Sequence, residues 1–198
     1  FDSRTGNETL KMRLNDLQLK NLYELLGCYL GDARDLKQFA GNGPLNTDDR
    51  PVVMFAAPRF VYSEQEPAHR RLIEIIDQFK PESSAVMQAA ESDEARDTHA
   101  RLAKYWTARN RFIHAGVNVP QTRDVRRLLA HVREPLLEVI RMSADFDSAY
   151  RPLLAMARSM VQLDPAAGSE LLVRLAEANP TRPEASELLK TLPPKDRG

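Results

Sequence analysis

From Pro67 onward, segments of helical hydrophobic periodicity alternate with short breaks at proline, glycine or aspartate. The segments are about 10 to 16 residues long, which is the length of helices in stacked hairpins. Residues three and four apart share one side of an α-helix. In the first segment, PAHRRLIEIIDQFK, that side carries Leu72, Ile73, Ile76 and Phe79. We therefore predict a mainly α chain, with a helical-hairpin array following a short mixed N-terminal segment.

Several predicted helix ends carry recognisable cap residues. Asp32 precedes ARDLKQFA as an N-cap, and Gly41 follows it as a stop. Asp164 is an N-cap followed by Pro165 at the first helical position, and NPTRPEA, residues 179–185, repeats this device. These signals divide the end of the chain into three helices.

Two further signals concern the middle of the chain. Gly116 is predicted to end a helix as a C′ glycine, and Pro135 is predicted to kink or divide the next helix. In the acidic run AAESDEARD, residues 89–97, Ser92 is predicted to cap the helix that follows it.

The first part of the chain has a mixed character. Alternating apolar residues in 10–19 allow a strand, although the following LKNLYELLGCYL fits an amphipathic helix. Residues 43–51 are dense in turn formers, and VVMF, residues 52–55, is β-prone and predicts a single short strand or an extended segment.

Composition excludes several classes of protein. The 28 basic and 28 acidic residues balance, whereas nucleic-acid binding proteins usually carry a basic excess, so we expect no nucleic-acid partner. The single cysteine, Cys28, excludes an internal disulfide and a Cys-based zinc cluster, and we expect it to be a buried apolar residue. No apolar run is long enough to span a bilayer. Because no signal peptide is seen and the first residue is Phe1, we expect a soluble, cytoplasmic piece of a longer protein.

Two groups of residues favour structural over chemical roles. None of the four histidines forms an HxxxH or HxH pair, so we expect no metal site. In AKYWTARNRF, basic and aromatic residues interleave, as they do in proteins that stack nucleobases. Leu102, Tyr105, Trp106 and Arg109 share one helical side, which instead predicts core packing with an arginine that extends to the surface.

The stretch LNTDDRPVVMFAAPRF resembles a segment near the C-terminal end of spermidine synthase-like proteins, especially the bacterial membrane-fused kind. The resemblance covers about residues 20–62, with Met54 where family members often carry a glutamate. The matching residues are Asn46, Thr47, Asp48, Asp49, Arg50, Pro51, Phe55, Pro58 and Arg59.

This resemblance implies a parent protein with an aminopropyltransferase-like core upstream of Phe1 and a possible membrane anchor. The family's glycine-rich nucleoside-binding loop and catalytic aspartate motif are missing here, so we expect no catalytic residue and no cofactor in this chain. Asp48, Asp49 and Arg50 are the candidate binding residues. A structural turn explains them as well, because adjacent side chains in an extended segment diverge.

The C-terminal segment SMVQLDPAAGSELLVRLAEANPTRPEASELL resembles the end of a tetratricopeptide-like array. Its two Asx-Pro pairs are closer than one repeat of about 34 residues, so they mark successive helices. We accordingly predict two domains, 1–62 and 63–198. The residues that carry the resemblance are Leu163, Asp164, Pro165, Leu171, Leu172, Leu175, Ala178, Asn179, Pro180, Pro183, Glu184 and Ala185.

Three functions remain open at this point. The first is a non-catalytic interaction or regulatory region that binds a protein partner or the parent's own catalytic core. In the second, the acidic residues contribute to amine-substrate binding in a polyamine aminopropyltransferase. The third is a stand-alone helical adaptor.

Overall fold

The structure is a computed structural model of the chain. It describes residues 12–14, 16–17, 19–43, 46–52, 54, 68–87, 89, 91–117 and 119–192. Helices dominate these residues, as the sequence predicts, and their β pairing is confined to one isolated bridge between Thr47 and Arg50. Within this part of the chain, no helix combines the length and the apolar character needed to cross a membrane.

Two compact units are distinguished by their internal contacts. The smaller unit is Leu30–Pro81, and the larger combines Phe1–Tyr29 with Glu82–Gly198. The predicted domain boundary at residue 62 lies outside the described residues and remains a prediction.

The smaller unit contains the helices α3, Ala33–Ala40, and α5, Ala68–Gln78. The predicted caps of α3 are confirmed, because the Asp32 carboxylate accepts from two backbone N–H groups and Gly41 follows with a φ of 56°. The ring of Phe39 meets that of Phe79 edge-on, with centroids 5.8 Å apart. α3 and the end of α5 are therefore joined through an aromatic pair.

Neither the strand that the sequence allows in 10–19 nor the one predicted at VVMF is seen in the residues that the structure describes there. Met12–Leu14 is helical, as are Val52 and Met54 within the VVMF segment. In the amphipathic segment between them, the structure has the short helix α2, Leu22–Leu26. Intrinsic β preference at these positions is thus overridden, as it often is when sheet partners are lacking.

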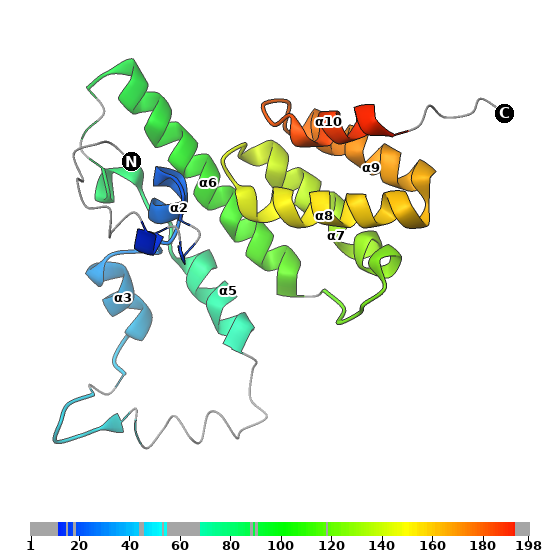
Figure 1. The fold of residues 1–198 in the computed structure, drawn as a ribbon. Coiled ribbons are helices and arrows are strands. Elements are labelled where there is room, and N and C mark those ends of the chain that lie inside the picture. Colours follow the sequence, from blue (N-terminus) through cyan, green and yellow to red (C-terminus); the bar gives the residue numbers. More distant parts are fainter. Residues whose placement is uncertain are drawn as a thin grey trace. The chain divides into compact units, whose positions relative to one another are not determined.

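The larger unit is built from α6, Asp93–Val117; α7, Val125–Met142; α8, Asp147–Leu163; α9, Pro165–Ala178; and α10, Glu184–Thr191. Each of these helices packs against the next along the chain, and α7 also packs against α9. In Figure 1, α8 and α9 run side by side, with α10 beside α9. This is the predicted arrangement of helical hairpins.

The core of the larger unit comes from facing sides of these helices. Two aromatic contacts centre on Phe146, whose ring lies 5.0 Å from Tyr105 and 5.3 Å from Phe112 between centroids. The largest fully buried side chains of the array are Leu102, Leu137, Val139, Ile140, Tyr150, Leu153, Leu172 and Leu175.

Helix caps follow the predictions in part. The Ser92 Oγ accepts from Ala95 N at 3.1 Å, and the Asp164 Oδ1 accepts from Ala167 N at 3.0 Å, with Pro165 in the first turn. The second predicted device is wrong, since α10 begins after Pro183 without a side-chain cap. Asn179 instead donates to the Ala144 carbonyl at 3.2 Å, which fixes a turn rather than a helix start.

The predicted breaks in the middle of the chain are also corrected. Gly116 lies inside α6 rather than after it, and α7 continues undivided through Pro135. Pro152 lies inside α8 in the same way. These prolines are tolerated because they remove one hydrogen bond each from helices that are held by long packed faces.

At Gly168, α9 lies close to the backbone of α8. A Cβ on Gly168 would lie 2.5 Å from Val161 N and 2.7 Å from Val161 Cα, and backbone atoms cannot move aside as a side-chain tip does. A Cβ on Gly116 would meet nothing within 4 Å.

We therefore expect opposite effects from the same substitution at the two helical glycines. Gly168→Ala should lower the free energy of unfolding by about 1–3 kcal/mol through overpacking. Gly116→Ala, the matched control, should leave it unchanged or raise it by up to about 1 kcal/mol. Urea unfolding followed by circular dichroism measures both, and equal effects would contradict the close α8–α9 crossing.

Candidate functional site

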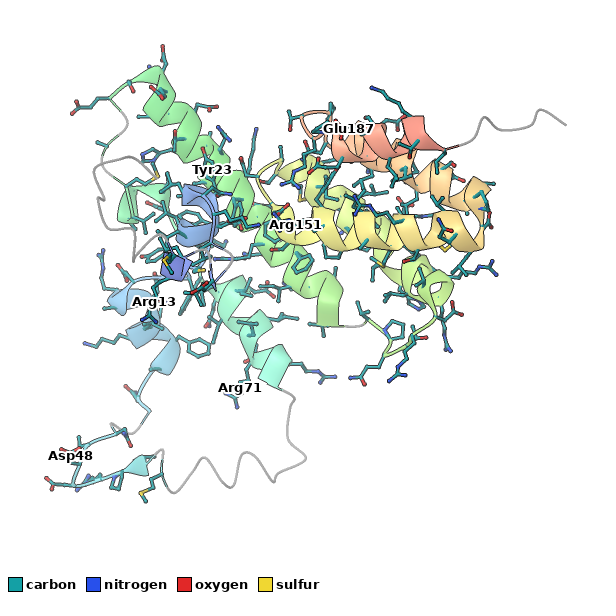
Figure 2. All side chains as sticks on the ribbon, viewed as in Figure 1. Arg13, Tyr23, Asp48, Arg71, Arg151 and Glu187 are labelled. Carbon is teal, nitrogen blue, oxygen red and sulfur yellow. The ribbon has the colours of Figure 1, made fainter. Side chains whose placement is uncertain are left out.

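The three residues singled out by the sequence lie in a tight turn. Thr47 N donates to Arg50 O at 3.1 Å, and Arg50 N donates to Thr47 O at 3.0 Å and to Thr47 Oγ1 at 3.1 Å. The predicted turn is therefore confirmed, although Thr47 rather than Asp48 caps the backbone. Asp48, Asp49 and Arg50 are all exposed, and Figure 2 labels Asp48 on this turn.

Exposure limits what these carboxylates can do alone. Two unit charges 4 Å apart in water attract by only about 1 kcal/mol. A cationic amine would therefore bind Asp48 and Asp49 weakly unless other groups enclose it.

A more strongly built polar site lies where α6 meets the end of α2. Arg109 donates from Nη1 to the Gly27 carbonyl at 2.7 Å and to the Tyr29 carbonyl at 2.6 Å. One turn earlier, Trp106 donates from Nε1 to the Leu26 carbonyl at 3.0 Å. The last carbonyls of a helix lack partners within the helix. We call this set, Trp106 and Arg109 with the three carbonyls, the carbonyl clamp.

Arg109 carries its charge into a buried position. The residue is only 9% exposed, and burial lowers the pKa of its guanidinium. Arginine nevertheless stays protonated at neutral pH. The negative end of the α2 backbone dipoles faces this cation, which offsets part of its desolvation. The carbonyl clamp is therefore a structural device that holds residues 26–29 against α6.

The sequence predicted the shared side of Leu102, Tyr105, Trp106 and Arg109 correctly, since all four are buried. It predicted the direction of Arg109 wrongly, because the guanidinium turns inward. The signal that was missed is the end of the LLGCYL segment, where the carbonyls of Gly27 and Tyr29 accept from Arg109 rather than from their own neighbours.

Tyr23 of α2 contacts a second arginine of α6. The Arg101 guanidinium lies 4.7 Å from the centre of the Tyr23 ring, which Figure 2 labels. Arg101 also donates to both carboxylate oxygens of Asp145, at 2.6 and 3.1 Å. Hydrogen bonding to Asp145 raises the pKa of Arg101. This contact joins α2, α6 and the turn before α8.

A further cluster fixes the turn between α9 and α10. Arg182 pairs with Asp147, Nη1 to Oδ1 at 2.5 Å, and lies 4.5 Å above the ring of buried Tyr150. Arg151 pairs with the same carboxylate. One acidic residue at the start of α8 therefore holds two cations, one of them from the α9–α10 turn.

Two grooves open on different sides of α7. The apolar groove, about 190 Å³, lies between α6, α7 and α8, and its lining includes both helix-interior prolines. The arginine groove, about 240 Å³, lies between α7, α8 and α9. It is lined by Arg126, Leu129, Ala130, Arg133, Met160, Ala167 and Leu171.

The prediction for the cysteine is wrong, and two of the histidines have hydrogen-bond partners in the structure. Cys28 is exposed, so the prediction that it is buried is wrong; its neighbour Gly27 is the residue packed against Tyr105. His99 Nδ1 lies 2.7 Å from Ser83 Oγ, and His131 Nδ1 lies 2.9 Å from Arg127 O. Among the residues with described positions, no group of three or more His, Cys, Asp or Glu is placed to hold a metal ion.

No protein-family model matches this chain, and no curated protein or solved structure is detectably similar to it.

We expect the carbonyl clamp to be a major source of stability. Arg109→Met should lower the free energy of unfolding by about 3 kcal/mol, because each buried carbonyl left without a donor costs about 1–3 kcal/mol. Hydrogen exchange of the α2 amides should accelerate as well. Arg111→Met is the matched control on the same helix: its exposed pair with Glu138, 3.0 Å, should contribute less than about 1 kcal/mol. Equal losses in the two variants would contradict a special role of Arg109.

We also expect stability to fall at high pH. Burial raises the pKa of Tyr105 above its ordinary value, and burial does the same at Tyr150. A raised folded-state pKa stabilises the fold below the unfolded pKa, near 10, and this contribution is lost as pH rises further.

Tyr105→Phe should therefore lose less stability above pH 10 than the unsubstituted chain, by up to about 1.4 kcal/mol for each pH unit. Urea unfolding at pH 8 and at successive values above 10 measures this difference. If the unfolding free energies of the two proteins had the same pH dependence, the pKa of Tyr105 would not be raised in the folded state.

Proposed function

We propose that this chain is a non-catalytic interaction and regulatory region of a spermidine synthase-like protein, and that its helical hairpins bind a protein partner or the parent's own catalytic core. The observation that carries the proposal is the packing of α7 against α6, α8 and α9 together. That packing buries one side of α7 and leaves two further sides open, one in the apolar groove and one in the arginine groove.

Such an array suits binding because packed helices keep its surface in a fixed shape. Stacked helix pairs bury their apolar sides against one another and present extended surfaces between them. Because Gly168 has no Cβ, α9 can lie close to α8 at this point. The ion pair of Arg182 with Asp147 connects the α9–α10 turn to α8. The groove walls are thereby fixed before a partner arrives, which lowers the entropic cost of binding.

The link to a spermidine synthase-like parent rests on the sequence alone. It depends on Asn46–Pro51 and on Phe55, Pro58 and Arg59, of which the last three lie outside the described residues. The turn at Thr47–Arg50 is compatible with this motif having a structural role beside a catalytic core.

The second candidate is that Asp48 and Asp49 supply carboxylates to amine-substrate binding. The exposure of both side chains on one turn favours it, since a substrate could reach them. A weak attraction in water requires further groups, which the parent's core would have to supply.

One set of measurements tests both candidates. The isolated chain should transfer no aminopropyl group from decarboxylated S-adenosylmethionine to putrescine, and calorimetry with putrescine should show no saturable heat. In the full-length parent, lysine cross-linking should connect Lys104 of α6 or Lys190 of α10 to the core or to a second polypeptide.

The outcomes separate the candidates. Turnover by the chain alone would contradict a non-catalytic role. Putrescine heat that Asp48→Asn or Asp49→Asn removes, but Asp93→Asn keeps, would establish the second candidate. Cross-links confined to the chain itself would contradict the interaction role.

A further inference from the structure

We propose that the arginine groove binds an acidic peptide segment of a partner protein, with carboxylates on Arg126 and Arg133 and an apolar side chain between them. This inference rests on the proposed function and names the chemistry of its partner. It starts from the lining, which combines two arginines with five apolar residues and includes no acidic residue.

The two lining arginines retain capacity for an added carboxylate. Arg126 donates from Nη2 to the Leu163 carbonyl at 3.1 Å, which orients its guanidinium without neutralising its charge. Arg133 donates from Nε to Glu134 at 3.1 Å, but Glu134 also accepts two bonds of 2.6 Å from Arg174. Two arginines therefore share one carboxylate at this edge of the groove.

Arg174 is the closer of the two arginine partners of Glu134, with two bonds of 2.6 Å against one of 3.1 Å from Arg133. Arg174 donates from Nη1 to Oε1 and from Nη2 to Oε2 of Glu134. Hydrogen bonding to Arg174 lowers the pKa of the Glu134 carboxyl. Glu134 thus stays ionised with Arg174 as its main partner, and Arg133 is held only by a second, exposed contact. A partner carboxylate can take both terminal nitrogens of Arg133, the geometry that arginine favours.

Two acidic residues near the groove, Asp124 and Asp164, cap helix starts, whereas Glu170, beside Leu171 in sequence, is exposed within α9. The Asp124 carboxylate accepts from Arg126 N at 2.9 Å, and the Asp164 carboxylate caps α9 through Ala167 N. Arg127, exposed on the first turn of α7, adds further positive charge at this end. Charge complementarity therefore selects an anionic ligand.

The apolar lining and the size of the groove select a peptide among anionic ligands. Leu129, Met160 and Leu171 offer an apolar floor that a phosphate backbone cannot use. The groove, about 240 Å³, is smaller than the roughly 300–1,000 Å³ of most small-molecule sites and suits a side chain as an anchor. The zero net charge of the chain gives nucleic acid little long-range attraction.

The test uses a labelled peptide, Gly-Glu-Glu-Leu-Glu-Glu-Gly, and fluorescence anisotropy with the chain. We expect saturable binding in the micromolar range that weakens with added salt. A peptide with glutamine for every glutamate, and one with alanine for leucine, should each bind at least about fivefold more weakly. A single-stranded DNA of equal charge should not compete.

Variants locate the site. Arg133→Gln should weaken peptide binding about fivefold or more, and Arg133→Lys should weaken it less, because lysine keeps the charge but loses the paired geometry. Arg141→Gln, an arginine of the same helix outside the groove, should bind as the unsubstituted chain does. The ion pair of Arg133 with Glu134 is exposed on both sides, so its removal should leave the thermal unfolding midpoint almost unchanged.

Four results would overturn the proposal: no binding below about 1 mM, equal binding of the glutamine peptide, equal weakening by Arg141→Gln, or DNA competing as well as the acidic peptide. Cross-links to a partner in the full-length protein together with any of these results would leave the interaction role intact and reject this groove. Peptide binding without such cross-links would support the groove and reject the proposed parent arrangement.

Discussion

The carbonyl clamp is the interaction that holds the N-terminal part of the larger unit, residues 26–29, on α6. Trp106 and Arg109, one turn apart on α6, provide donors for the carbonyls of Leu26, Gly27 and Tyr29. Without them, a five-residue helix has too few internal bonds to persist, since short helices need tertiary packing. The clamp therefore joins the start of the larger unit to the helix on which the array begins, across some 80 residues of sequence.

Features that depend on a few neighbouring residues were predictable from the sequence. Asp32 and Asp164 cap the helices that follow them because the capping bonds reach only two or three residues along the chain. The array itself was predictable for a related reason, because the 3.6-residue period of each segment specifies which side must be covered. The turn at Thr47–Arg50 belongs to the same class, although the capping oxygen came from Thr47.

Features that depend on distant partners were not predictable in the same way. Whether Gly116 ends a helix depends on what the next residues pack against, and here α6 continues past it. Asn179 resembles a cap in sequence, but its amide meets the Ala144 carbonyl, 35 residues away, instead. Cys28 lies in an apolar run and is exposed because the adjacent Gly27 takes the position against Tyr105. In each case the competing partner is invisible to a local pattern.

The arginines show that residues of one type, which cannot be told apart in the sequence, have different roles in the folded chain. Arg109 is buried and donates to backbone carbonyls, so its charge stabilises the fold. Arg182 lies on an aromatic ring and an acidic residue, which commits it to the α9–α10 turn. Arg133 shares the Glu134 carboxylate with Arg174 and lines the arginine groove. A chain of zero net charge can therefore present a locally cationic surface, because its acidic residues are used as caps and as partners of other arginines.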